Sequence, residues 1–364
     1  MDFELTDDQR QLQTIVRDVA TRECPGSYVR AVIAGDHDGE SLWKTYVGLD
    51  WPSLTIPEND GGIGYSTVEL VLMAEELGAV ADPTPLLATS SNYLPLVRES
   101  ASPRQRQSLL TPLCSGSTGA AALGSAEVSA HFDNGECTLQ GVARNVLDGD
   151  RAESVALVAS SARGEVVCVV PRADLRATRT QSFDATLHIA DVNVDGVVVD
   201  SDRVLLAGGS VGIERARQEA VTGLAATMVG ASRRILDLAL AHVRDRHQFG
   251  VPIGSFQAIK HMAVDMYLSI ERARVLCQFA ALAIAEDDPR RQMAASMAKA
   301  AAGDCQRISV RHGIQLFGGL GFTWENDLHL YVRRAKAGEL LLGTSANHNT
   351  HVARAVFAAL EPVR

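Results

Sequence analysis

The sequence predicts an α+β protein in which a helical part, a β part and a second helical part follow one another. Apolar residues recur at helical spacing before about residue 115 and after about residue 210, and short runs rich in β-branched residues lie between. The 364 residues leave room for about two or three domains. We therefore expect a helical domain at 1–115, a small antiparallel β domain at 116–209 and a helical bundle at 210–364.

The first part opens with the signal of a helix start. Thr6 and Gln9 have the spacing of a capping box, with Thr6 as the N-cap and Gln9 at N3. Pro, Asn and Gly make 56–64 a loop. The next helix covers about 68–77 and is expected to end at Gly78, because glycine often follows the last helical residue.

The middle part changes to the period of strands. The runs 153–158, 165–170 and 186–194 are short, rich in β-branched residues and separated by turn residues. Alternation in the last run slips by one after Ile189, which a β-bulge would absorb. No Gly-rich strand–turn–helix unit is present, which disfavours a Rossmann nucleotide site.

The third part is helical again. Its first helix breaks at 249–254, a second is expected from about 255 to 286 and a third over about 289–315. A glycine turn at 318–321 leads to a short helix and to a final helix from about His348. Steps of four and three predict a buried seam on the first helix, made of Leu224, Met228, Ala231, Ile235, Leu238 and His242.

Charge and composition exclude several classes of protein. The net charge is −10 and the pI is about 5.5, so the chain would repel nucleic-acid phosphates. No apolar run reaches the ~18 residues of a membrane span, and the N-terminus lacks a secretory signal. We therefore expect a cytoplasmic protein. The six scattered cysteines and the histidines show no metal-ligand spacing, and we expect the cysteines to be buried thiols.

Three segments carry residues suited to binding an anion. Arg246 lies just before the helix break, and the start of the next helix offers backbone N–H groups. The glycines of 315–322 would let the backbone approach a flat ligand. Thr344 and Ser345 place small hydroxyls at a loop-to-helix junction. Taken singly, these features could also be a solvated arginine, a plain helix connection and ordinary N-caps.

Taken together and in this order, the segments resemble the acyl-CoA dehydrogenases, which are flavoenzymes. The resemblance covers nearly the whole chain and is most specific in its C-terminal part. It implies a helical N-terminal domain, a central antiparallel β domain and a C-terminal four-helix bundle. The matching segments are Leu5-Thr6-Asp7-Asp8-Gln9, Ile56-Pro57-Glu58 with Gly61, Gly62 and Gly64, Glu75-Glu76-Leu77-Gly78, Arg246-His247-Gln248-Phe249-Gly250 through Phe256-Gln257, and Gln315 to Gly321.

The resemblance implies FAD as cofactor and an acyl-CoA thioester as substrate. In this family a carboxylate removes the α proton while the β hydrogen leaves as hydride to the flavin. The C-terminal residues reach the ADP and pyrophosphate half of a flavin held mainly by a neighbouring subunit, which implies at least a dimer. The implied FAD contacts are Arg246, Gln248, Phe249, Ile253, Gln257, Gln315, Gly318 and Gly319, with Thr344 near the flavin.

The sequence departs from the family where the proton is removed. Most members place the base immediately before Gly-Thr-Ser, and here that residue is Leu342. Other members carry it on the first bundle helix, where the matching position is Ala220 and its neighbour is Glu219. Glu219 is the candidate base, although one residue turns a helical side chain by ~100°. Glu219 could also be a solvated glutamate on the helix face.

The β part departs too. The family's Thr-Glu-Pro…Gly-Ser-Asp loop is replaced by residues 123–128, and its Trp-Ile-Thr strand by Asn145-Val146-Leu147. Contacts to the flavin ring are therefore expected to be missing from this chain.

These departures favour one subunit of a heteromeric acyl-CoA dehydrogenase, with a homologous chain as partner supplying the base and the ring contacts. Such unequal pairs occur among actinobacterial enzymes that act on steroid-CoA thioesters, and this substrate is an analogy only. A homomeric enzyme stays open. So do a non-catalytic scaffold or regulatory subunit of the same fold and a flavin-dependent acyl-CoA oxidase.

Overall fold

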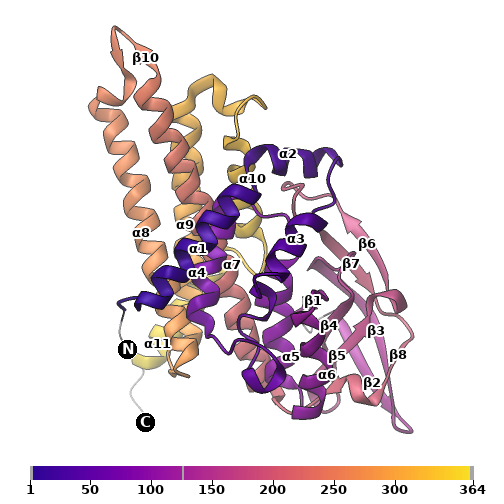
Figure 1. The fold of residues 1–364 in the computed structure, drawn as a ribbon. Helices are drawn as coiled ribbons and strands as arrows, with labels where there is room; N and C mark the ends of the chain where they lie inside the picture. The colour runs from indigo at the N-terminus through magenta and orange to yellow at the C-terminus, as the bar shows by residue number, and fades with distance from the viewer. Residues whose placement is uncertain (1–2, 125–126, 361–364) are drawn as a thin grey trace. The chain divides into compact units, whose positions relative to one another are not determined.

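The computed structural model describes residues 3–124 and 127–360 (Figure 1). The chain forms two compact units, each assembled from separate stretches of sequence. The helical unit comprises Met1–Ala34, Val71–Asp82 and Val221–Arg364, and the sheet unit comprises Gly35–Leu70 and Pro83–Ala220. Both units take residues from the first and third predicted parts, so the domain boundaries at residues 115 and 209 stay a prediction.

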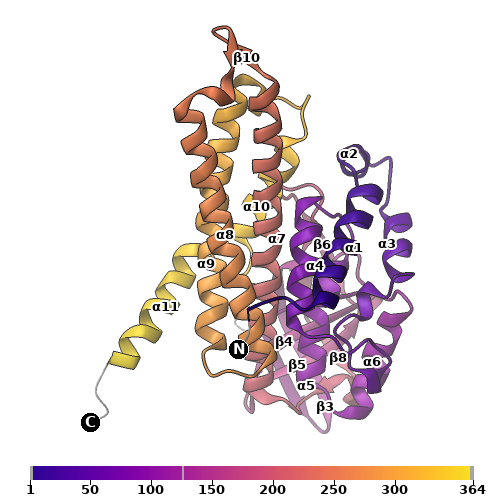
Figure 2. The same cartoon turned by 60° about the vertical axis from the view of Figure 1, so that its left-hand side comes forward.

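The helical unit contains the expected C-terminal bundle. Figures 1 and 2 both show α8, α9 and the later part of α7 running along one another. α8 packs closely on α9, and α10 and α11 also contact α9. The helices of this unit are α1 (Asp7–Glu23), α2 (Gly26–Ala34), α8 (Gln257–Ala285), α9 (Arg291–Phe317), α10 (Leu328–Leu340) and α11 (Ser345–Leu360), with most of α4 (Thr67–Ala79) and α7 (Gly209–Asp245).

The ends of these helices test the local signals. The capping box is confirmed, because Thr6 accepts from the Gln9 backbone N–H and the Gln9 side chain accepts from that of Thr6. The expected end at Gly78 is wrong, because α4 continues to Ala79. Gly78 serves a helix crossing instead: a Cβ there would lie 2.1 Å from the carbonyl oxygen of Thr227. The last helix begins at Ser345, three residues before the expected His348.

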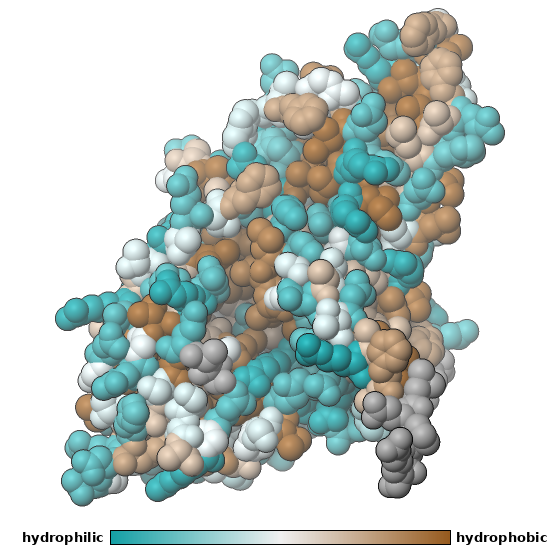
Figure 3. Space-filling view, turned by 180° about the vertical axis from the view of Figure 1, so that it is seen from behind, coloured by the Kyte–Doolittle hydropathy of each residue, from teal (hydrophilic) through white to brown (hydrophobic). Residues whose placement is uncertain are grey.

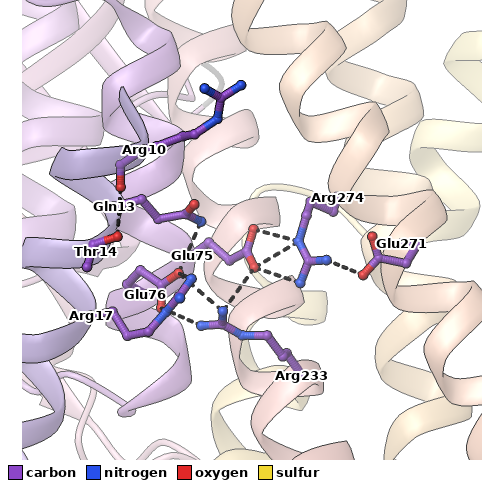
Figure 4. A network of polar contacts seen from close by, with 9 residues as sticks. All are labelled: Arg10, Gln13, Thr14, Arg17, Glu75, Glu76, Arg233, Glu271 and Arg274. Carbon is purple, nitrogen blue, oxygen red and sulfur yellow. Dashed lines mark hydrogen bonds and ion pairs between the residues drawn. The ribbon is translucent and has the colours of Figure 1, made fainter. Parts of the chain in front are cut away.

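Buried ion pairs join four helices of this unit (Figure 4). Glu76 of α4 accepts from Arg17 of α1 at 2.9 Å and from Arg233 of α7. Its neighbour Glu75 accepts from Arg274 of α8, also at 2.9 Å. The side chains of Glu75 and Glu76 are at most 5% exposed, so each depends on its arginines to offset the loss of water. The network therefore fixes α1, α4, α7 and α8 against one another.

The sheet unit is built around one nine-stranded sheet with the order β6-β7-β3-β2-β4-β5-β9, in which β1 pairs with β4 and β8 with β3. The sheet is mainly antiparallel as expected, but β1 and β4 run parallel, because the β2–β3 hairpin lies between them in sequence. The strands are β1 (Gly119–Ala122), β2 (Val128–Asp133), β3 (Glu136–Leu147), β4 (Ser154–Ser161), β5 (Gly164–Pro171), β6 (Arg176–Thr180), β7 (Ile189–Asn193), β8 (Val197–Val199) and β9 (Val204–Leu205).

Short helices complete the sheet unit, and its core lies against the sheet. These helices are α3 (Glu40–Val47), α5 (Leu94–Ser100) and α6 (Pro103–Cys114). Alternate residues of the strands enter the core, among them Val155, Leu157, Cys168 and Val170. The irregularity expected near Ile189 exists, but the extra residue lies on the partner strand β3, between Ala143 and Val146.

Five cysteines are buried free thiols as expected, and Cys114 is half-buried. No helix in the described part of the chain is long and apolar enough to cross a membrane.

Candidate functional site

A two-stranded hairpin follows α7 at one end of the bundle. It consists of β10 (His247–Gln248) and β11 (Val251–Pro252) and turns through Phe249 and Gly250. Both turn residues have positive φ, 54° and 81°, as a two-residue turn with right-handed strand twist requires. The Ile253 N–H donates to the Arg246 carbonyl at 2.8 Å and closes the hairpin. The hairpin therefore has a defined shape before any ligand binds.

This hairpin leaves a cation and an aromatic ring uncovered. Arg246 is exposed and has no carboxylate within ion-pair distance among the described residues. Phe249 is 91% exposed, and its ring meets the edge of the Phe256 ring at 6.1 Å between centroids. Figure 3 shows hydrophobic residues gathered at this projecting end of the bundle. Exposed apolar rings beside such a guanidinium are suited to a ligand or to another protein surface.

The glycine turn lies at the same end of the bundle. α9 ends at Phe317, whose ring stacks on His242, one turn before Arg246 on α7, at 4.4 Å and 11°. Gly318 has φ 62° and ψ −137°. A Cβ at Gly318 or Gly319 would meet no heavy atom within 4 Å, so the described protein leaves this backbone open. An extended ligand could therefore approach the turn closely.

The start of α8 adds a third component. Its N-cap is Phe256, whose side chain makes no cap hydrogen bond, and Gln257 is the first helical residue. Gln248, Gln257 and Gln315 are all exposed. An uncapped helix start offers backbone N–H groups and a positive dipole end to an anion. Together with Arg246 these groups fit a diphosphate, and the structure brings eight of the nine predicted cofactor residues to this end.

Thr344 is the exception. Its hydroxyl and N–H both donate to Asn347 Oδ1, at 2.6 and 3.0 Å, and the Asn347 N–H returns a bond to the Thr344 hydroxyl. Thr344 is thus the N-cap of α11, which was the alternative to a cofactor contact for this segment. The Gly343 carbonyl contacts Lys299, which lies 18 residues before Phe317 on α9. At ~1.5 Å per residue Thr344 is roughly 27 Å from the glycine turn.

The positions where a base was sought differ from what the sequence predicted. Leu342 is half-buried with φ 53°, and its side chain cannot accept a proton. Ala220 is fully buried. Glu219 is 1% exposed, so a solvated glutamate is wrong; it forms an ion pair with Arg98 of α5 inside the sheet unit. Burial raises the pKa of the Glu219 carboxyl more than Arg98 lowers it.

The segments of the sheet unit that replace the expected flavin-ring contacts are partly described. Ser125 and Ala126 lie outside the described residues. The Leu123 carbonyl oxygen accepts a hydrogen bond from Arg217 Nε at 2.8 Å. Asn145 lies in the β3 bulge with φ 54°, and its N–H donates to Asp191 at 3.1 Å. The absence of ring contacts from this chain stays a prediction.

Sequence reasoning missed one cavity in the helical unit. It has a volume of about 360 Å³ and lies beside Arg17 and Glu76, with Arg234 and Tyr331 on its wall. The Arg234 guanidinium lies over the Tyr331 ring at 5.6 Å. The wall residues come from four separate segments of sequence, so no local motif could have indicated the cavity.

Comparison with known proteins places this geometry in context. Two family models match the chain: the acyl-CoA dehydrogenase N-terminal domain over residues 6–117 and the C-terminal domain over 211–357. Acyl-CoA dehydrogenase IpdE2 of Mycobacterium tuberculosis is 30% identical over 342 residues, covering 92% of this chain and 93% of that protein. Acyl-CoA dehydrogenase FadE34 of the same organism is 33% identical over 360 residues; the match covers 94% of this chain but only 47% of that protein.

Solved structures share the fold. The ChsE4-ChsE5 complex of Mycobacterium tuberculosis contains a chain that superposes with a TM-score of 0.92 at 24% identity, and the match covers 100% of both chains. At this identity the likeness concerns the fold alone.

Proposed function

The chain belongs to the acyl-CoA dehydrogenase family, and from this premise we propose that it acts in the FAD-dependent α,β-dehydrogenation of an acyl-CoA thioester as one subunit of a heteromeric enzyme. Its partner is a homologous acyl-CoA dehydrogenase chain. We call residues 246–257 together with the glycine turn at 318–321 the hairpin end. In this arrangement the hairpin end completes an FAD site that the partner holds.

One observation carries the proposal: Arg246, the open backbone of the glycine turn and an uncovered Phe249 lie at the same end of the bundle. Burying such a ring is worth about 1.5–3 kcal/mol, so a 91% exposed phenylalanine on a fixed turn favours a covering protein surface. The described chain provides no such cover. The ChsE4-ChsE5 structure is a complex of two differently named chains, which supports a heteromer for a chain of this fold.

The residues at the hairpin end fit the nucleotide half of FAD. The Arg246 guanidinium would neutralise the diphosphate, and the open backbone at Gly318 and Gly319 would allow close approach. When bound, FAD supplies the acceptor for the hydride from the β carbon. Thr344, at the start of α11, lies roughly 27 Å from this cluster by the length of α9 between Lys299 and Phe317, so we assign it to the flavin of its own subunit and Arg246 to that of the neighbour.

Removal of the α proton needs a carboxylate, and neither position where the family carries its base provides an accessible carboxylate in this chain. Leu342 has no acceptor atom in its side chain. Glu219 has a raised pKa, as a general base requires, and its Oε2 has no hydrogen-bond partner among the described residues. Its other oxygen is bound by Arg98, which holds the carboxylate in the interior of the sheet unit. We therefore assign the base to the partner. The same Leu342 favours the second candidate, a non-catalytic subunit.

Expression with and without a homologous chain from the same genome tests the proposal. We expect a colourless protein when the chain is purified alone, and a yellow complex that bleaches with acyl-CoA when both chains are expressed together. A protein that stays free of flavin whether or not the homologous chain is present would support the non-catalytic scaffold or regulatory subunit. Oxygen uptake with peroxide release would support the oxidase, and a yellow, active protein without a partner would support a homomeric enzyme.

A further inference from the structure

A lysine buried in the bundle holds the bend between α10 and α11 from inside. Lys299 of α9 is 0% exposed. Its Nζ donates to the carbonyl oxygens of Gly343 at 2.7 Å and Glu339 at 3.3 Å. These carbonyls lie at the end of α10 and within the bend. Since a buried amine needs acceptors, and helix-end carbonyls need donors, each satisfies the other.

The backbone of the bend has an unfavourable conformation that other contacts must stabilise. Leu342 and Gly343 both have positive φ, 53° and 92°. A left-handed conformation costs a bulky residue such as leucine roughly 1–2 kcal/mol. The Leu342 carbonyl accepts from His348 Nε2 of α11 at 2.9 Å, and one Glu339 carboxylate oxygen accepts from the Ser345 N–H at 2.9 Å. The side chains of Lys299, Glu339 and His348, one from each of three helices, thus bond backbone groups between residues 339 and 345.

The number of acceptors matches the neutral form of the lysine. A neutral amine has two N–H groups, and Lys299 has two carbonyl acceptors, whereas an ammonium would need a third. The other carboxylate oxygen of Glu339 is buried and has no hydrogen-bond partner among the described residues. Gly303 leaves the space for it, because a Cβ there would lie 2.3 Å from that oxygen. Glu339 therefore faces the lysine as a charge and not as a bonded partner.

Burial acts in the same direction, toward the neutral amine, which prevails only above about pH 8. Burial lowers the pKa of Lys299 to about 8, and the Glu339 charge only partly opposes it. Burial also lowers the pKa of His348, and Lys299 and His351 lower it further while its bond to the Leu342 carbonyl raises it. The groups facing the lysine are thus Glu339 from α10 and His348 from α11, and the His351 ring lies against that of His348.

We propose that Lys299 is a positioning residue whose two carbonyl bonds set the α10–α11 bend, and with it Leu342 and Thr344, for the flavin of this subunit. The inference rests on the proposed function only for its effect on flavin. The bend itself belongs to this chain alone and can be measured without a cofactor.

The proton on Lys299 gives the bend a pH dependence of known sign. When the bend opens, the lysine meets water and its pKa returns to about 10.4. Between about pH 8 and that value the open bend binds a proton that the closed bend lacks, so rising pH favours closure. We expect protection of the bend to grow by up to ~10-fold per pH unit above about pH 8, and to be flat below it.

Hydrogen exchange measured by mass spectrometry over residues 340–348, corrected for intrinsic exchange, tests this on the purified chain. Lys299→Met should speed exchange of the bend at every pH and abolish the pH step. Lys299→Arg should keep partial protection without the step, because arginine does not titrate. Lys336→Met removes an exposed lysine of α10 and should change nothing. A wild-type profile with no step would overturn the proposed titration even if the variants fail to fold.

Flavin content of the complex with the homologous chain then tests the positioning role. We expect Lys299→Met to retain less than about half of the flavin, in step with faster exchange, and Lys336→Met to retain all of it. A loosened bend with full flavin would refute the link to the cofactor. A bend that stays protected in a folded Lys299→Met variant would refute the positioning role, whatever the function of the complex.

Discussion

Gly230 of α7 lies directly against the backbone of Glu75 in α4: a Cβ on Gly230 would come 1.8 Å from the Glu75 carbonyl oxygen. The contact is reciprocal, because Gly78 of α4 faces Thr227 of α7 at 2.1 Å by the same measure. Two glycines therefore let the helix backbones touch within the helical unit. This close approach brings Glu75 and Glu76 within reach of Arg233.

Gly78→Ala should destabilise the protein, although alanine favours a helix by about 1 kcal/mol. The clash is with backbone atoms, so a helix must move, and overpacking of this kind costs about 1–3 kcal/mol. The midpoint of urea unfolding should fall accordingly. Gly319→Ala is the control, because its Cβ would meet open space and the midpoint should stay unchanged. Equal midpoints for both variants would refute the crossing.

The network on Glu76 should make stability fall in acid. Burial raises the pKa of Glu76, but hydrogen bonds from Arg17 and Arg233 lower it by more. The net pKa lies below the ordinary value of about 4.3, so this stabilisation is complete above that pH and is lost as the pH falls through the lowered pKa.

Glu76→Gln removes the charge that both arginines require. We expect a loss of about 1–3 kcal/mol at pH 7, because the hydrogen bonds to a charged acceptor are lost while Arg17 stays 48% exposed to water and Arg233 keeps its ion pair with Glu75 at 3.8 Å. The difference from wild type should shrink as the pH is lowered below about 4, because wild type then loses the same charge. Glu69→Gln is the control for a glutamate of the same helix outside the network. A difference that does not depend on pH would contradict this account.

Local signals in the sequence predicted the local structure well. The capping box at Thr6 needs only residues within one helical turn, and it was confirmed. Gly78 was misplaced because its role depends on Thr227, which is distant in sequence. The burial of Glu219 was missed for the same reason, since Arg98 lies on another helix.

The candidate site divides in the same way. The hairpin end combines two segments whose motifs were visible, at Arg246 and at Gly318. Their proximity depends on the stacking of His242 on Phe317, which no spacing rule gives. Lys299 carried no signal at all, because a single lysine on a helix is ordinarily exposed, and only the bend at Gly343 explains its burial.

Glu219→Gln should affect stability more than turnover. The variant keeps an acceptor for Arg98 but removes the charge, so we expect a lower melting temperature. Turnover per folded complex should stay within about 10-fold of wild type, whereas loss of a general base costs roughly 10²–10⁴-fold. Glu214→Gln changes a partly exposed glutamate of the same helix and should alter neither. A loss of turnover beyond about 10²-fold with an unchanged melting temperature would identify Glu219 as the base.

Arg246→Ala and Phe249→Ser should separate the two roles assigned to the hairpin end. Arg246→Ala removes the guanidinium, so the complex should assemble but lose flavin, more so at high salt because the contact is electrostatic. Phe249→Ser removes an apolar ring that is 91% exposed, so association should weaken by about 10-fold or more, with flavin lost as a consequence. Sedimentation velocity with detection at the flavin band measures both quantities together. Arg244→Ala and Ile15→Ser, exposed residues of α7 and α1, are the matched controls. If Arg246→Ala retains full flavin and Phe249→Ser still assembles at wild-type affinity, the hairpin end does not complete a neighbour's site, and a flavin in the complex must be held elsewhere.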